Sequence, residues 1–274
     1  MGAYIVNTRV LDLVDPSRPT DPVPDHPGGE TQGRRLPTQI WYPAGKGPFP
    51  VVLFAHGFDS TPDAYSDLLS GWASAGMIVA APTFPLTSSN TALTASDVPN
   101  QPADLSYALH QVLALDTTPG DAFNGMIDTA HVAAAGHSSG AVAALAMVNS
   151  CCRDDRITAS IALAGSTLWF GGDFVTPGVP TLLEHGIEDG TVPLTQAEAV
   201  YRSLPAPKAG VELLHGSHSG PYDDGRDPSF SIVLTTTTNF LRWALLDEED
   251  ALGRFREAAD APGLASLKAD ELGG

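Results

Sequence analysis

Residues 136–140 read Gly-His-Ser-Ser-Gly, a G-x-S-x-G spacing that offers Ser138 as a nucleophile. The pattern alone is weak evidence, because glycine and serine are common residues. Its surroundings strengthen it, since the apolar run His131–Ala135 predicts a strand before the motif and the small residues of Ala141–Met147 predict a helix after it. A sharp strand-to-helix turn exposes the serine hydroxyl and needs glycine on both sides. Ser139 is out of register with the two glycines, so Ser138 is the predicted nucleophile.

A histidine must lie near this serine, because a serine hydroxyl becomes a good nucleophile only when a base removes its proton. In the fold that carries such turns, an acid and then a histidine follow the serine along the chain. His185, His215 and His218 are the histidines beyond Ser138. His218 lies in a Gly/Ser loop after the predicted strand Val211–Leu214 and is the predicted base. His215 lies closer to that strand and remains an alternative, whereas His185 ends its own strand and is expected to be structural.

The predicted acid is Asp189, in the turn Gly186–Pro193 that follows the predicted strand Thr181–His185. Taken alone, an aspartate at such a place is typical of a turn. Its position between Ser138 and the predicted base, directly after a strand, favours a role in orienting the imidazole and stabilising its charged form. Glu188 is adjacent, but neighbouring side chains point apart, so only one of the two can serve.

A negative oxygen that forms on an attacked carbonyl group is best held by two fixed backbone N–H groups. The predicted donors of this oxyanion hole are Ser139, directly after the nucleophile, and Phe58, in the loop after the predicted strand Val51–Ala55. The Phe58 ring is either a core aromatic or a substrate-binding wall of the site, and the sequence leaves both open.

The connection Gly165–Val179 is too short for the helical lid of capped lipases, so we expect an open site. Trp169 in this connection is a predicted substrate-binding residue, and Phe170 beside it is more typical of ordinary packing. The loop Thr83–Pro102 leaves the carboxyl end of a predicted strand and is expected to border the same site. An open groove with aromatic walls suits esters with short or medium acyl groups and leaves room for polymer chains.

Apolar runs of strand length alternate with helical patterns along most of the chain. Such alternation predicts a mostly parallel central sheet with helices on both faces, and the Ser138 turn makes this an α/β-hydrolase fold without a lid domain. We expect one domain over residues 1–246, with an irregular segment over 15–37, and an acidic helix and loose tail over 247–274. The predicted strands and helices are, in order, 39–42, 51–55, 65–73, 78–81, 103–115, 131–135, 139–148, 157–164, 181–185, 196–204, 211–214 and 231–246.

The 274 residues carry 14 Lys and Arg against 32 Asp and Glu, a net charge of −18. This charge disfavours nucleic acid and anionic membranes, which bind through clustered basic side chains. No apolar run approaches the length of a membrane span, and Met1–Val14 lacks the features of a signal peptide. Cys151 and Cys152 are adjacent and give no disulfide framework. We therefore expect no nucleic-acid or membrane partner, while the compartment and the oligomeric state stay open.

The chain resembles a group of α/β-hydrolases that includes dienelactone hydrolases, chlorophyllases, type II platelet-activating-factor acetylhydrolases and cutinase-like polyester hydrolases. The resemblance rests on residues 35–43 and 48–58, on the Ser138 turn, and on the turns that hold Asp189 and His218. It implies a serine carboxylic-ester hydrolase that works through an acyl-enzyme, needs no cofactor and acts on a small-molecule or polymeric ester.

The chain departs from the polyester hydrolases at two places. Ser139 stands where they usually carry methionine, and no cysteine follows Cys152 to form their C-terminal disulfide. Polyester cleavage is therefore an open expectation beside cleavage of esters with short or medium acyl groups.

Other interpretations use the same residues. A perhydrolase or a cofactor-free haloperoxidase employs the same three side chains, whereas a non-catalytic binding protein on this fold would usually have lost one of them. Dienelactone hydrolases carry cysteine where this chain has Ser138. A metal site built from His215 and His218, or from the aspartates of residues 223–227, has no evident third ligand beside the histidines, so we expect no metal.

Overall fold

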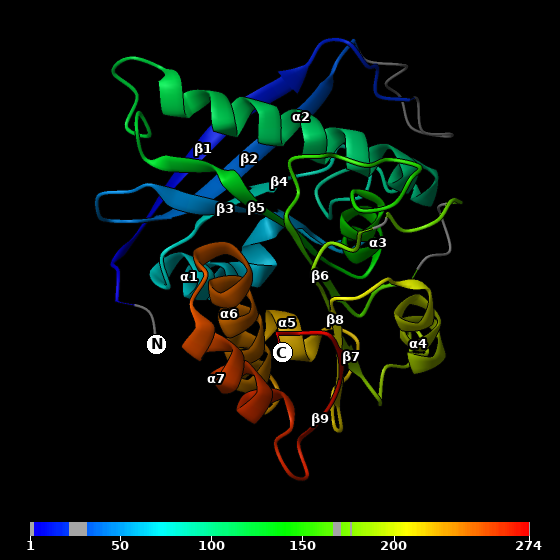
Figure 1. Ribbon diagram of the computed structural model, residues 1–274. Helices are drawn as coiled ribbons and strands as arrows, with labels where there is room; N and C mark the ends of the chain where they lie inside the picture. Colours follow the sequence, from blue (N-terminus) through cyan, green and yellow to red (C-terminus); the bar gives the residue numbers. More distant parts are fainter. Residues whose placement is uncertain (1–2, 22–31, 167–170, 176, 274) are drawn as a thin grey trace.

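The computed structural model describes residues 3–21, 32–166, 171–175 and 177–273. Within these residues, nine strands form one sheet in the order β1-β2-β4-β3-β5-β6-β7-β8-β9 (Figure 1). The strands are β1 (Val6–Asp15), β2 (Arg34–Pro43), β3 (Phe49–Ala55), β4 (Ile78–Pro82), β5 (Ile127–His137), β6 (Ala159–Leu163), β7 (Thr181–Gly186), β8 (Lys208–Leu213) and β9 (Ala265–Asp270). The helices are α1 (Ser66–Ser74), α2 (Gln101–Ala114), α3 (Ser139–Ala146), α4 (Leu194–Ser203), α5 (Gly220–Asp223), α6 (Phe230–Leu246) and α7 (Glu249–Ala259), with 3-10 turns η1 (Pro62–Tyr65), η2 (Ala95–Asn100) and η3 (Leu115–Thr117). In the described part of the chain, no helix combines the length and the apolar character that crossing a membrane requires.

The middle of the sheet is parallel. Six neighbouring strands, β4, β3, β5, β6, β7 and β8, run in the same direction. Four of them, β3, β4, β6 and β7, are buried at every position, as expected for strands covered on both faces. The outer strands are antiparallel, since β2 pairs with both β1 and β4 and β9 pairs with β8. This is the α/β-hydrolase fold that the sequence predicts.

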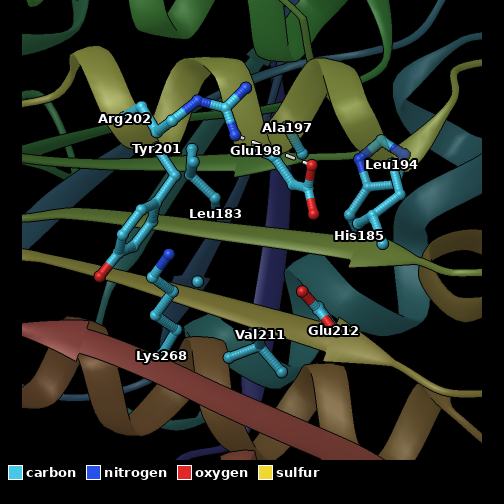
Figure 2. Close-up of a pocket in the computed structure, with 11 residues that line it drawn as sticks. Leu183, His185, Leu194, Ala197, Glu198, Tyr201, Arg202, Val211, Glu212 and Lys268 are labelled. Atoms are coloured by element: carbon cyan, nitrogen blue, oxygen red, sulfur yellow. Dashed lines mark ion pairs between the residues drawn. The ribbon is translucent and has the colours of Figure 1, made fainter.

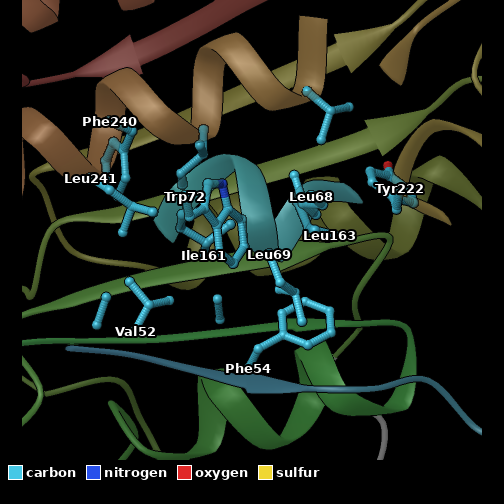
Figure 3. Packing of buried hydrophobic residues seen from close by; sticks show 14 of the residues in the cluster. Val52, Phe54, Leu68, Leu69, Trp72, Ile161, Leu163, Tyr222, Phe240 and Leu241 are labelled. Carbon is cyan, nitrogen blue, oxygen red and sulfur yellow. The ribbon is translucent and has the colours of Figure 1, made fainter. Parts of the chain in front are cut away.

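Helices cover both faces of the sheet (Figure 1). Helices α1, α6 and α7 pack on one face, and α2, α3 and α4 pack on the other. On the first face Trp72 of α1 is fully buried, and its Nε1–H donates to Thr237 Oγ1 of α6 at 2.9 Å. Figure 3 shows Trp72 together with Phe240 and Leu241 of α6 and with Phe54 of β3. This packing holds the strands in place. The candidate active site lies at the carboxyl ends of the parallel strands.

Both outer edges of the sheet differ from the sequence expectation. The sequence predicts no strand before residue 39, yet β1 pairs with β2 along its whole length, and residues 34–37 belong to β2 rather than to an irregular segment. The expectation of a loose tail is wrong for Ala265–Asp270, because these residues form β9 and pair with β8. Strand β9 takes up backbone groups that β8 would otherwise leave unpaired at the edge of the sheet.

A buried ionic cluster anchors the loop Thr83–Pro102. Arg34 in β2 is 1% exposed, and its Nε and Nη2 donate to Asp104 of α2 at 2.7 Å each. Its Nη1 and Nη2 also donate to Asp97 of η2 at 2.9 Å each. Arg18 adds a second partner for Asp104 at 2.7 Å. The end of the loop that leads into α2 is therefore tied to β2.

Candidate active site

Ser138 stands at the turn between β5 and α3, with backbone angles φ 54° and ψ −120°. A positive φ is strained for a residue with a side chain, and it persists only where the surroundings enforce it. Both flanking glycines are needed for close approach. A Cβ on Gly136 would overlap the backbone of Gly140, and a Cβ on Gly140 would overlap the carbonyl group of Ala55. The predicted strand-to-helix turn is therefore present, with Ser138 at its tip.

The structure brings the three predicted side chains together from three separate loops. His218 follows β8, and its Nε2 lies 2.9 Å from Ser138 Oγ. Asp189 follows β7, and its Oδ2 lies 2.7 Å from His218 Nδ1. When Nδ1–H donates to the carboxylate, Nε2 is left as the acceptor that faces the serine hydroxyl. These contacts form a candidate catalytic triad at the carboxyl edge of the sheet.

The surroundings of Asp189 favour its charged form. Its side chain is buried, and its Oδ1 accepts the N–H groups of Thr191 and Val192 at 2.8 Å each. Burial raises the pKa of this carboxyl group, but the hydrogen bonds from His218, Val192 and Thr191 outweigh burial and lower the pKa. The carboxylate is therefore ionised at neutral pH and holds the proton of His218 on Nδ1.

The alternative pair, His215 and Glu188, lies at the surface. His215 Nδ1 is 3.3 Å from Glu188 Oε1, and the two side chains are 68% and 62% exposed. Among the described residues, no hydrogen bond joins His215 to Ser138. The geometry therefore favours His218 over His215 as the partner of the serine.

His185 is a buried neighbour of the acid. Its Nε2 lies 2.8 Å from the carbonyl oxygen of Val192 and 3.2 Å from Asp189 Oδ2, and burial lowers the pKa of its imidazole. Figure 2 shows His185 in the wall of a cavity of about 90 Å³ that lies between α4 and the last strands of the sheet. Neither Ser138 nor His218 lines this cavity. His185 is therefore a buried contact of Asp189, in keeping with the structural role expected for it.

The loop after β3 lies against the nucleophile. A Cβ added to Gly57 would stand 3.5 Å from Ser138 Cβ. Among the described residues, no acceptor takes up the N–H of Phe58 or of Ser139, so both donors are available to a ligand. The Phe58 side chain is 40% exposed, so its ring is a surface aromatic beside the site rather than a core residue.

The loop Thr83–Pro102 contacts the loop after β3, which carries Phe58. Asp59 N–H donates to the carbonyl oxygen of Thr87 at 2.9 Å, and Ser89 N–H donates to that of Ser60 at 3.1 Å. The loop Thr83–Pro102 therefore lies beside the loop that carries Phe58, where the sequence predicts one border of the site.

The β6–β7 connection, residues 164–180, holds the remaining predicted residues. Trp169 and Phe170 lie outside the described residues. The described part of this connection contains no helix, as the absence of a lid domain requires.

Two buried residues beside the candidate triad are not among the site residues that the sequence predicts. Tyr65 Oη lies 2.8 Å from His137 Nδ1, and His137 Nε2 lies 2.8 Å from the backbone oxygen of His218. One signal pointed to His137, since it directly precedes Ser138. The sequence holds no comparable signal for Tyr65, which looks like an ordinary apolar position of a helix.

In the described part of the chain, no group of three or more His, Cys, Asp or Glu side chains is placed to hold a metal ion. Asp224 pairs instead with Arg226 at 3.0 Å, and Asp227 Oδ1 accepts the N–H of Ser229 at 2.8 Å.

The chlorophyllase family model matches residues 29–165, half of the 274-residue chain. This stretch contains Phe58 and the Ser138 turn. The chain belongs to the chlorophyllase family. The family is part of the α/β-hydrolase superfamily.

Chlorophyllase-1, chloroplastic, of Citrus sinensis is 32% identical to this chlorophyllase-family protein over 146 residues, which are 53% of this chain and 39% of that protein. The match thus spans well under two thirds of the relative. The family match ends before β7, so Asp189 and His218 lie outside it, and their assignment rests on the geometry described above.

Proposed function

We propose that this protein is a serine esterase that cleaves carboxylic esters through an acyl-enzyme on Ser138. The observation that carries the proposal is the pair of contacts that His218 makes, 2.9 Å to Ser138 Oγ and 2.7 Å to Asp189 Oδ2. Family membership supports ester hydrolysis in general, and the geometry supports the role that we propose for each side chain.

Acylation begins when Ser138 Oγ bonds to the ester carbonyl carbon and His218 Nε2 takes the hydroxyl proton. The carbonyl oxygen becomes negative, and the N–H groups of Phe58 and Ser139 bind it. Asp189 stabilises the imidazolium that forms. The intermediate then collapses, the bond to the alcohol oxygen breaks, and His218 gives its proton to the departing alkoxide.

Deacylation repeats these steps with water. His218 takes a proton from a water molecule whose oxygen bonds to the acyl carbon. Collapse of the second intermediate breaks the bond to Ser138 Oγ, releases the carboxylic acid and returns the proton to the serine.

The substrate class is an ester with a short or medium acyl group, with polyesters as a second class to be tested. The exposed ring of Phe58 offers an apolar wall beside the oxyanion donors. The described part of the β6–β7 connection forms no helical cover over the site, so a substrate enters from solvent.

Labelling with a fluorophosphonate, followed by peptide mass analysis, tests the nucleophile directly. The label is expected on the peptide that contains Ser138 and is expected to be lost in Ser138→Ala. A series of p-nitrophenyl esters tests the substrate class, with acetate, butyrate and octanoate expected to be cleaved faster than palmitate. Release of soluble products from a polycaprolactone film tests the polyester class separately.

Three results would redirect the proposal. A label on another residue would move the nucleophile away from Ser138. Formation of peracetic acid from acetate and hydrogen peroxide at a rate above that of ester hydrolysis would favour a perhydrolase. If no residue is labelled and no ester is cleaved, a binding protein on this fold would be favoured.

A further inference from the structure

Three hydrogen bonds, two of them buried and the third partly buried, join the loops that carry the candidate site residues. Gly57 N–H donates to Tyr65 Oη at 3.2 Å, Tyr65 Oη lies 2.8 Å from His137 Nδ1, and His137 Nε2 lies 2.8 Å from the carbonyl oxygen of His218. Tyr65 and His137 are each 2% exposed. The three bonds therefore form one continuous series in which both side chains are buried.

The direction of every bond in this series is determined. A carbonyl oxygen only accepts, so His137 Nε2 carries a proton and donates it to His218 O. Burial is the main cause that lowers the pKa of His137 to about 3, so its imidazole is neutral and Nδ1 is an acceptor. Tyr65 must then donate its hydroxyl hydrogen to Nδ1, and its oxygen accepts the N–H of Gly57.

The two ends of this series of hydrogen bonds lie at the proposed oxyanion donor and at the proposed base. Gly57 directly precedes Phe58, the proposed oxyanion donor. The His218 carbonyl belongs to the residue whose Nε2 faces Ser138. His137, in the middle, directly precedes the nucleophile. A Cβ on Gly57 would stand 3.1 Å from both His137 Nδ1 and Tyr65 Oη, so the loop is packed tightly onto these two side chains.

We propose that Tyr65 and His137 are positioning residues. They hold the loop after β3 with Phe58 (the oxyanion loop) and the loop after β8 with His215 and His218 (the base loop) at fixed positions relative to Ser138. The inference rests on the proposed function, because it assigns these residues to the esterase site. Loss of the Tyr65 hydroxyl leaves the Gly57 N–H and the His137 Nδ1 buried without partners, and both loops then shift to recover hydrogen bonds. Shifts of about 1 Å at reacting groups lower rates by about 100-fold.

The matched pair Tyr65→Phe and Tyr222→Phe tests this role. Each change removes one buried tyrosine hydroxyl, and each ring lies against His137, with centroids 5.6 Å away for Tyr65 and 5.0 Å for Tyr222. The Tyr222 hydroxyl, however, donates to the carbonyl oxygen of Glu184 at 3.2 Å and takes no part in the three hydrogen bonds that link Gly57 to His218. Tyr65→Phe is expected to lower kcat/KM for p-nitrophenyl butyrate by about 10- to 100-fold, and Tyr222→Phe by less than about threefold.

A second readout separates positioning from loss of folded protein. A trifluoromethyl ketone adds to Ser138 Oγ and forms an oxyanion, whereas the corresponding methyl ketone binds largely without this adduct. In Tyr65→Phe the affinity for the trifluoromethyl ketone is expected to fall in step with kcat/KM, while the affinity for the methyl ketone stays within about twofold. A parallel loss of both affinities would indicate a structural role and overturn the inference.

His137 offers an independent comparison if Tyr65→Phe fails to fold. His137→Gln retains an amide N–H that can donate to the His218 carbonyl, and His137→Leu retains no donor. The glutamine variant is expected to keep at least about tenfold more kcat/KM than the leucine variant. Equal activity of the two would overturn the inference. If wild-type protein cleaves esters and Tyr65→Phe has the same kcat/KM as Tyr222→Phe, the inference is overturned while the proposed function stands. Wild-type protein that neither cleaves esters nor binds the trifluoromethyl ketone would overturn the proposed function itself.

Discussion

The carboxyl group of Glu184 in β7 accepts a hydrogen bond from the hydroxyl of Thr236 in α6, and both side chains are buried between the sheet and the helix. Burial raises the pKa of Glu184 to about 8, and the bond from Thr236 offsets only part of this effect. Among the described residues, its second oxygen has no hydrogen-bond partner. Glu184 is therefore a neutral carboxylic acid at neutral pH.

This neutral acid predicts a pH-dependent stability. The pKa of Glu184 is about 8 in the folded protein and has its ordinary acidic value in the unfolded chain, so between these two values the folded state holds one more proton. Its contribution to the free energy of unfolding is complete below the unfolded value and is lost as pH rises toward 8. Glu184→Gln mimics the neutral acid and is expected to unfold at a higher temperature than wild type at pH 9. The difference should shrink as pH falls to 5, and a difference that is constant with pH would contradict the neutral acid.

Ser138→Ala is expected to fold and to lose its activity. The small side chain suits the tight turn, whereas the nucleophile is gone, so kcat on p-nitrophenyl butyrate should fall by about 10⁴- to 10⁶-fold. Circular dichroism and thermal unfolding check that the fold persists. Activity near that of wild type would show that another residue attacks the ester.

Replacing the two histidines of the base loop one at a time separates the roles of His218 and His215. His218→Ala removes the acceptor of the serine proton and should lower kcat/KM by about 10³-fold or more. His215→Ala removes an exposed side chain and should leave kcat/KM within about threefold of wild type. The opposite ranking of the two variants would assign the base to His215.

Arg34 and Arg35 are adjacent in β2 and should differ strongly in their effect on stability. Arg34→Met leaves the buried carboxylates of Asp97 and Asp104 without their main partner, which should lower the free energy of unfolding by about 3–5 kcal/mol. Arg35 pairs with Asp12 at the surface, where the two side chains are 70% and 72% exposed. Arg35→Met should therefore cost roughly 0–1 kcal/mol. Urea unfolding of both variants measures the difference, and similar losses would show that the buried cluster has no special weight.

Soluble esters should be cleaved with ordinary saturation kinetics. The described part of residues 164–180 forms no helical lid for an oil interface to open. Rates on tributyrin and p-nitrophenyl butyrate should therefore show no jump as the substrate passes its solubility limit. A sharp increase at that limit would mean that a segment of the chain covers the site in water.

The site and the fold differed in how much the sequence revealed. Ser138 was predictable because its turn is a local pattern of glycines between a strand and a helix. Asp189 and His218 followed from chain order, since each comes directly after a strand of a parallel sheet. Strand β1 is half-exposed and carries charged residues such as Arg9 and Asp12, so its pattern is weak and its pairing with β2 defines it.

The chain of hydrogen bonds through Tyr65 and His137 was beyond the reach of sequence patterns for a different reason. Tyr65 and His137 are 72 positions apart, and His137 meets a backbone oxygen 81 positions further on. Every residue has a backbone carbonyl oxygen, so the residue type does not show which of these oxygens accepts a hydrogen bond. Such contacts become visible only when the tertiary structure places three loops side by side.

The span between Ser138 and His218, 80 positions along the chain, also bears on how activity arises during folding. The proposed nucleophile and base come together only when β6, β7 and β8 have joined β5 in the sheet, and closing loops of this size is slow compared with forming helices. A chain whose helices have formed while β7 and β8 are still unpaired holds Ser138 without His218 beside it. The ester cleavage that we propose is therefore a probe of long-range assembly, whereas far-ultraviolet circular dichroism responds already to the local structure that precedes it.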